Sequence, residues 1–143
     1  MSYRASGEQA SNKDYKYAIL IMMKDQDLFI NELIQLFPSL KEEFLDEDYR
    51  DSITFQMGRF KRFIQQAIAK NDLNAFDVMV DFLTKNLPLV DKRVQNAVYL
   101  SFLGKLDFSE NPDLKKRLGQ HLGEAYTDIE NYNNSPRNNR GTE

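Results

Sequence analysis

The chain has 143 residues with 22 acidic and 19 Lys or Arg side chains, a formal net charge of −3, no Cys and a single His. Without Cys, a disulfide scaffold, a thiolate metal site and a Cys nucleophile are excluded, and a zinc site with two imidazoles cannot form within one chain. A Ser-His-Asp triad would have to use His121. The length predicts one domain.

The N-terminal region has a polar part and an apolar part. Residues 1–16 are polar and show no periodicity, which predicts a disordered extension. Residues 17–23 form an apolar run that ends at Lys24. This run is far shorter than the roughly 20 residues of a membrane span, and no small-residue cleavage site follows it. We therefore expect a cytoplasmic protein with no membrane association. One interpretation of the run is that it packs on the first helix; the other is that translation starts at Met22 or Met23, which makes the residues before it a dispensable extension.

Two helices are predicted next. Apolar residues recur at helical spacing over residues 25–37, where Asp25 or Asp27 can accept the free amides of the first turn, and the proline that follows ends the helix. Ser39 and Glu42 have the spacing of a capping box, which predicts that Ser39 caps a short second helix.

The middle of the chain predicts two longer helices. The first covers residues 49–70 and contains Gly58, which we expect to permit close helix packing. Asn71 and Asp72 are predicted to end this helix and cap the next one, over residues 73–87.

The last third of the chain predicts shorter helices separated by glycine and proline. Pro88 is placed in the first turn of a fifth helix, and Gly104 is expected to stop that helix. Ser109 is predicted to cap a sixth helix with a proline in its first turn, and Gly119 and Gly123 to interrupt it before a final amphipathic piece.

These patterns predict an all-α fold, as a compact bundle or an orthogonal array of five to six helices with disordered termini. No stretch shows the period-two alternation of a strand. A single helical domain is predicted over residues 17–130, followed by a disordered tail over residues 131–143. The aromatic residues fall mostly on apolar helix faces, which places them in the core.

The most uneven feature of the sequence is its negative charge. Six carboxylates fall within ten residues: Glu42, Glu43, Asp46, Glu47, Asp48 and Asp51. The cluster follows a helix end into a loop, so its side chains point in several directions and do not converge as acid–base catalysis or a calcium loop requires. It is either a solvated turn near the positive end of the following helix or an acidic docking face for a basic protein.

Other candidate sites are weaker. His121 and Glu124 lie three residues apart, but a di-iron bundle needs two such motifs and more carboxylates. Arg59, Lys61 and Arg62 are three cations in an acidic chain and make a poor footprint for nucleic acid. No glycine-rich phosphate loop is present. We therefore predict no catalytic residues, no metal, no cofactor and no nucleic-acid partner.

Two motifs carry a family resemblance. The stretch Glu32–Leu40 has the pattern E-L-x-x-x-F-P-x-L, and Ser101–Leu106 has the pattern S-F-L-x-x-L. In these motifs the chain resembles a group of small, uncharacterised bacterial helical proteins, some of which are similar to the immunity proteins that neutralise polymorphic bacterial toxins. The resemblance covers about residues 25–129. It implies a binding role and adds no catalytic residue, because the matching positions are apolar or capping ones.

The sequence therefore predicts a non-catalytic protein-binding module of immunity type, which neutralises a toxin by direct binding. The partner is expected to be a protein such as a basic toxin domain, bound through the six clustered carboxylates. The alternatives are a helical scaffold without a toxin partner and, less in keeping with the residues present, an enzyme whose site uses carboxylates, Tyr and Lys.

Overall fold

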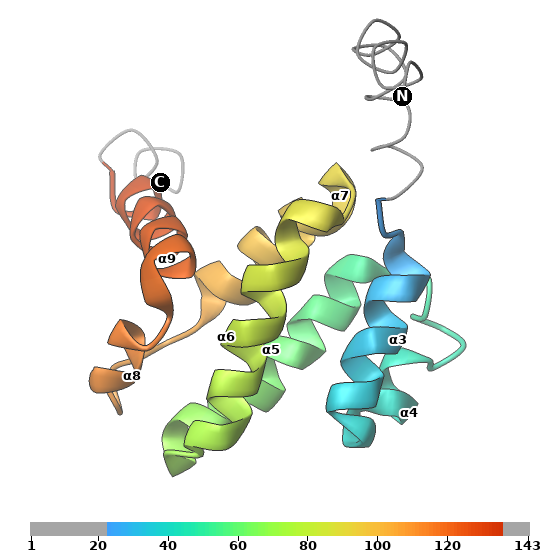
Figure 1. The fold of residues 1–143 in the computed structure, drawn as a ribbon, viewed down its shortest axis with the longest axis horizontal. Helices are drawn as coiled ribbons and strands as arrows, with labels where there is room; N and C mark the ends of the chain where they lie inside the picture. The colour runs from blue at the N-terminus through green and yellow to red at the C-terminus, as the bar shows by residue number, and fades with distance from the viewer. Residues whose placement is uncertain (1–22, 136–143) are drawn as a thin grey trace, which may run out of the picture.

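The computed structural model describes residues 23–135, and over this part of the chain the fold is all-α, which confirms the predicted class (Figure 1). Its α-helices are α3 (Gln26–Leu36), α4 (Lys41–Phe44), α5 (Ile53–Lys70), α6 (Leu73–Asn86), α7 (Lys92–Ala97), α8 (Asp113–Lys116) and α9 (Gly119–Asn133). Tighter or wider helical turns connect them: the 3-10 turns η1 (Pro38–Leu40), η2 (Leu87–Leu89) and η4 (Leu103–Lys105), and the π-helical turn η3 (Val98–Phe102). The predicted extension over residues 1–16 lies outside the described residues.

The start of α3 confirms one of the two predicted caps, whereas the predicted cap of α4 is wrong. The Asp25 carboxylate accepts a hydrogen bond of 3.0 Å from the backbone N–H of Leu28. Pro38 ends α3 but also begins η1, so the chain reaches α4 already in a helical conformation. Leu40, not Ser39, is therefore the N-cap residue of α4, and no side chain caps this helix.

Helix α5 starts later than predicted. Ser52 accepts a hydrogen bond of 3.1 Å from the Phe55 N–H and begins the helix at Ile53, while Tyr49 lies in the preceding turns. The expectation for Gly58 is also wrong, because a Cβ atom at this position would meet nothing within 4 Å. The backbone of α5 is therefore not in close contact with another helix at this glycine.

The junction of α5 and α6 follows the prediction, whereas the start of α7 does not. Asn71 ends α5 in the left-handed conformation with a φ of 57°, and Asp72 caps α6. Pro88 lies in η2, which continues directly from α6, so it does not open the fifth helix. The cap of α7 is instead Asp91.

Gly104 does not stop a helix, because the helical path continues from α7 through η3 and η4. A Cβ atom on Gly104 would lie 2.8 Å from Cγ2 of Ile129 and 3.1 Å from the carbonyl oxygen of Tyr99. Real Cβ contacts are longer than this, so the glycine is required where η4 approaches α9.

The C-terminal helices correct two further expectations. Ser109 does not cap α8, since no side chain does, and its N–H instead donates to Asp107 at 2.9 Å. Gly119 is the first residue of α9 and has a φ of +81°, so the helical path breaks here as predicted, but Gly123 lies inside α9 without interrupting it. Helix α9 continues to Asn133, past the predicted end of the helical domain.

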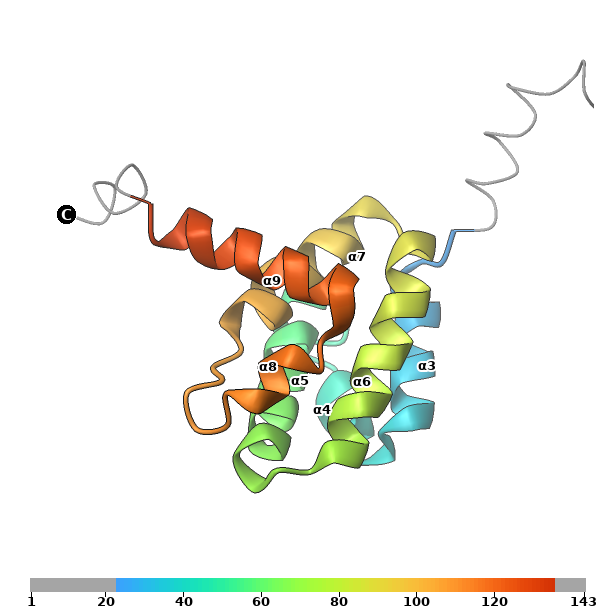
Figure 2. The same ribbon diagram turned by 60° about the vertical axis from the view of Figure 1, so that its left-hand side comes forward.

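The core is built around α5, which packs against α6 and the η3 turn. The rings of Phe60 and Phe102 stack with centroids 4.6 Å apart, and Phe29 meets Phe82 at 5.5 Å. Helices α3, α5 and α6 run side by side, and α9 crosses near one end of them (Figure 2). None of the helices in residues 23–135 is long and apolar enough to cross a membrane.

Candidate functional site

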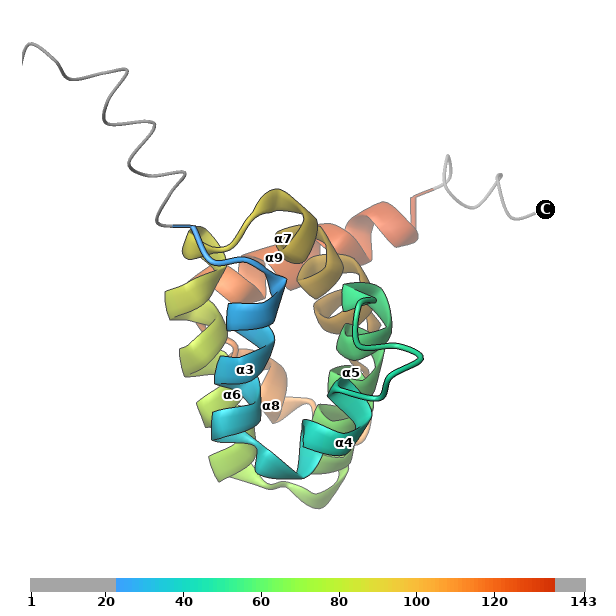
Figure 3. The ribbon, with the colours of Figure 1, turned by 90° about the vertical axis from the view of Figure 1, so that its right-hand side faces the viewer.

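The six clustered carboxylates lie on one projecting part of the surface, which we call the acidic segment (residues 42–51). It begins in α4 and continues through the turns that lead to α5, where Figure 3 shows the loop standing out from the helices. Every one of the six acidic residues is exposed: Glu42, Glu43, Asp46, Glu47, Asp48 and Asp51. All six predicted residues are therefore accessible on this segment.

The acidic segment has a defined backbone path. The carbonyl of Asp46 accepts hydrogen bonds from the N–H groups of Tyr49 and Arg50 at 2.9 and 2.8 Å, and its carboxylate accepts one from the N–H of Asp48 at 2.9 Å. The Ser52 N–H then donates to the carbonyl of Tyr49 at 2.9 Å. These local bonds form consecutive turns, for which an Asp at the first position is favourable.

A buried glutamine on α5 holds the acidic segment in place through hydrogen bonds. Gln56 is only 1% exposed, and its amide N–H₂ donates to the carbonyls of Phe44 at 2.8 Å and Arg50 at 3.0 Å. Its side-chain oxygen accepts a hydrogen bond of 2.9 Å from Gln26, whose own oxygen accepts one of 2.8 Å from Arg93. Both ends of the segment are thus bonded to the same side chain.

Sequence reasoning missed Gln56, although the sequence contains a signal for it. Gln56 lies three residues after Ile53 and four before Phe60, on the apolar face of its helix. A polar side chain on such a face requires hydrogen-bond partners inside the protein.

The acidic segment also carries exposed apolar surface. Leu45 is 40% exposed and Tyr49 45% exposed. The ring of Tyr49 stacks on Phe55 with centroids 3.9 Å apart and an interplanar angle of 16°, and the guanidinium of Arg59 lies 4.8 Å from the centroid of Phe55. We call the stack of Tyr49, Phe55 and Arg59 the aromatic ladder. Tyr49 was not predicted here, because the sequence placed it at the start of a helix.

The charges of the segment are largely directed to solvent. Glu43 lies 3.9 Å from Arg59, which is a long and exposed ion pair. Among residues 23–135, no group of three or more Asp, Glu or His side chains is arranged to hold a metal ion. The surface therefore presents negative charge without concentrating it on one point.

Two shallow hollows flank the acidic segment. One, of about 410 Å³, lies toward α3 and is lined by Asp27, Asn31, Leu45, Arg50 and Asp51 together with the buried glutamine. The other, of about 340 Å³, lies between the start of α5 and the α7–η3 turn, beside the exposed Leu100. The surface around the segment is thus uneven.

The other predicted candidates do not form a site together. His121 is exposed, with its Nε2 3.5 Å from the hydroxyl of Tyr99, while Glu124 accepts a hydrogen bond from Gln120 instead. The three cations near the middle of α5 also separate. Arg59 faces the acidic segment, whereas Lys61 and Arg62 line a different hollow together with two acidic residues.

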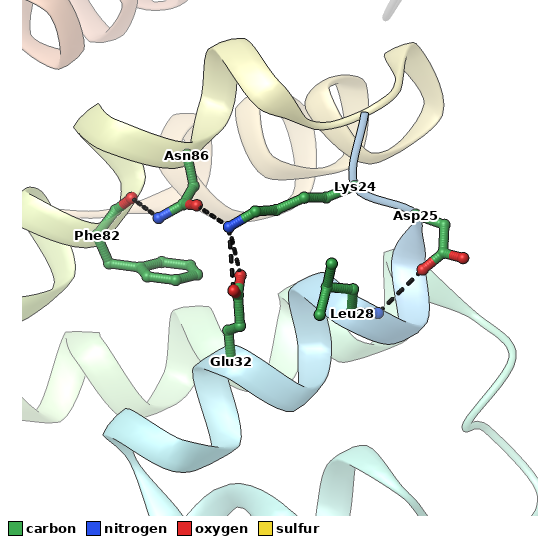
Figure 4. A network of polar contacts seen from close by, with 6 residues as sticks. All are labelled: Lys24, Asp25, Leu28, Glu32, Phe82 and Asn86. Atoms are coloured by element: carbon green, nitrogen blue, oxygen red, sulfur yellow. Dashed lines mark hydrogen bonds and ion pairs between the residues drawn. The ribbon is translucent and has the colours of Figure 1, made fainter. Parts of the chain in front are cut away.

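A second polar cluster, which is half-buried, joins two parts of the fold (Figure 4). The ammonium group of Lys24 donates to both carboxylate oxygens of Glu32, at 2.8 and 3.0 Å, and to the side-chain oxygen of Asn86. The Asn86 amide donates to the carbonyl of Phe82 at 2.8 Å. Three acceptors thus surround the ammonium group, which matches its three donors, and the cluster joins the segment before α3 to the end of α6.

Comparison with known proteins places this surface within a family domain. The family described as "Domain of unknown function (DUF7674)" matches residues 30–134, which is more than half of the chain and includes the whole acidic segment. No curated protein and no solved structure matches the chain.

Proposed function

Since the chain belongs to the family of the Domain of unknown function (DUF7674), whose description assigns no activity, we propose a function from its surface. The protein is a non-catalytic binding module that recognises a basic protein through the acidic segment. Its specific role is that of a bacterial, cytoplasmic immunity-type protein, which neutralises a toxin by covering it.

The observation that carries this proposal is that the acidic segment is both charged and held in place. Association costs less free energy when the binding loop is already ordered, and Gln56 bonds to both ends of this loop. Six exposed carboxylates raise the rate of encounter with a basic partner.

The apolar groups within the segment support binding over simple solvation. A solvated turn needs only polar side chains, whereas Leu45 and Tyr49 are each at least 40% exposed among the carboxylates. Protein interfaces combine an apolar or aromatic centre with a polar rim, and Tyr is enriched among the residues that dominate binding energy. The segment has this composition.

The immunity-type role specifies which kind of basic protein is bound. A toxin domain that acts on nucleic acid carries a basic surface for phosphate, and an acidic face complements such a surface. The sequence resemblance to immunity-like helical proteins supports the same role.

Capture of a partner from the organism that encodes the chain tests the proposal, with three versions of the full chain as bait. The first is the wild type. The second neutralises four carboxylates of the acidic segment, leaving Glu43 and Asp46 with their bonds: Glu42→Gln, Glu47→Gln, Asp48→Asn and Asp51→Asn. The third makes the same change in charge on exposed carboxylates elsewhere: Asp81→Asn, Glu110→Gln, Glu124→Gln and Asp128→Asn.

We expect the wild type and the third version to capture the same basic protein, and the second to capture much less of it. Equal capture by all three versions would contradict the proposal. A captured nuclease or other toxin, inhibited by the chain at equimolar ratio, would support the immunity-type role, and a captured protein whose activity is unchanged would favour a scaffold.

A further inference from the structure

The aromatic ladder is partly exposed at Tyr49. One face of the Tyr49 ring packs on Phe55 at a centroid distance of 3.9 Å, and the residue is 45% exposed. The guanidinium of Arg59 also packs on Phe55, 4.8 Å from its centroid. The molecule thus already stacks a cation on this pair of rings.

Acidic residues lie beside the ladder. A small hollow of about 80 Å³ is lined by Tyr49, Phe55 and Arg59 together with Glu43 and Asp46. Two acidic residues and one arginine thus line this hollow, and the adjoining turn adds Glu47 and Asp48. A group placed against Tyr49 therefore meets an electron-rich ring and a surplus of negative charge.

We infer that the exposed side of Tyr49 is a binding site for an arginine side chain of the partner protein. A planar guanidinium stacks on an aromatic face and bonds to carboxylates with the same group, whereas a lysine ammonium is a more strongly hydrated point charge. Tyr49 thus anchors the partner, and the carboxylates around it attract the arginine. This inference rests on the proposed function, because it names the chemistry of the partner at the acidic segment.

The test uses the full chain and two small probes, a blocked arginine amide and the blocked citrulline amide, which has the same shape without the charge. Titration at low ionic strength is followed through the aromatic NMR signals of Tyr49 and Phe55. We expect saturable shifts with the arginine probe and none with citrulline. Tyr49→Leu should weaken arginine binding about two- to fivefold, the range of an exposed cation–π contact.

Two further variants control this result. Tyr49→Phe keeps the ring and should bind the arginine probe as the wild type does, while Tyr132→Leu removes a tyrosine on α9 that is even more exposed than Tyr49 and should change nothing. Unchanged affinity in Tyr49→Leu, or equal shifts with citrulline, would overturn the arginine site. The proposed function has its own test: it is contradicted if the variant with Glu42, Glu47, Asp48 and Asp51 neutralised captures as much partner as the wild type.

Discussion

Replacement of Gln56 by Leu tests how the acidic segment is held. The two side chains are similar in size, so the substitution leaves almost no cavity and mainly removes hydrogen bonds. Three groups lose a hydrogen bond: the carbonyls of Phe44 and Arg50 and the side-chain N–H₂ of Gln26. The last two keep only their longer mutual contact of 3.5 Å, and the Phe44 carbonyl loses its bond to a side chain altogether.

The expected loss of stability follows from the burial of these groups. A buried polar group left without a partner costs about 1–3 kcal/mol. The bonds to Phe44 and Gln26 are buried, whereas Arg50 lies at the surface and its carbonyl can be reached by water. We therefore expect the free energy of unfolding to fall by about 3 kcal/mol, which corresponds to roughly 10 °C in Tm for a domain of this size.

Urea unfolding followed by circular dichroism measures this change. Gln66→Leu is the matched control, because Gln66 lies on the same helix and is exposed. It should change stability by no more than about 0.5 kcal/mol. Hydrogen exchange gives a second readout, since the amides of residues 46–51 should exchange faster in Gln56→Leu and at the wild-type rate in Gln66→Leu.

The reasoning would be refuted if Gln56→Leu were as stable as Gln66→Leu. It would also be refuted if stability fell without faster exchange in the acidic segment, because the glutamine would then support the core alone.

Three other substitutions give further predictions. Gly104→Ala should destabilise the protein by about 1–3 kcal/mol in thermal unfolding, because its Cβ would lie 2.8 Å from the side chain of Ile129; wild-type stability would contradict the close approach. Gly58→Ala should raise the free energy of unfolding by about 0.5–1 kcal/mol, since the position is helical and open, and a loss would show an unseen contact. Hydrogen bonds from Arg117 hold the pKa of Asp77 below its ordinary value. The pair therefore stabilises the fold fully at a pH above the ordinary pKa of an Asp, and this contribution is lost as the pH falls through the lowered pKa. Asp77→Asn should therefore be less stable than the wild type at neutral pH and equal to it in strong acid; a difference that persists in acid would refute this.

The sequence predicted those parts of the fold that depend on neighbouring residues. The caps at Asp25 and Asp72 and the helix end at Asn71 follow from bonds within one turn, and the structure has them. The predicted caps at Ser39 and Ser109 are wrong because a Ser or Thr in the sequence does not reveal whether the chain already enters the helix through a 3-10 turn or another turn.

The candidate site was predictable in charge but not in construction. Six carboxylates in ten residues remain at the surface in almost any fold, because burial of a charge is costly. The stack of Tyr49 on Phe55 and the bonds of Gln56 to Phe44 and Arg50 depend on how the turns fold back on α5. No local pattern encodes that path.

The central claim is that the acidic segment recognises a basic protein, and association kinetics test it most directly. The association rate constant of the captured partner should be measured from low to high ionic strength for the wild type and the two charge variants. We predict that neutralising the acidic segment slows association at least tenfold at low ionic strength and flattens its salt dependence, while the variant with the same charge change elsewhere stays close to the wild type. Equal rate constants and equal salt dependence in both variants would contradict the account.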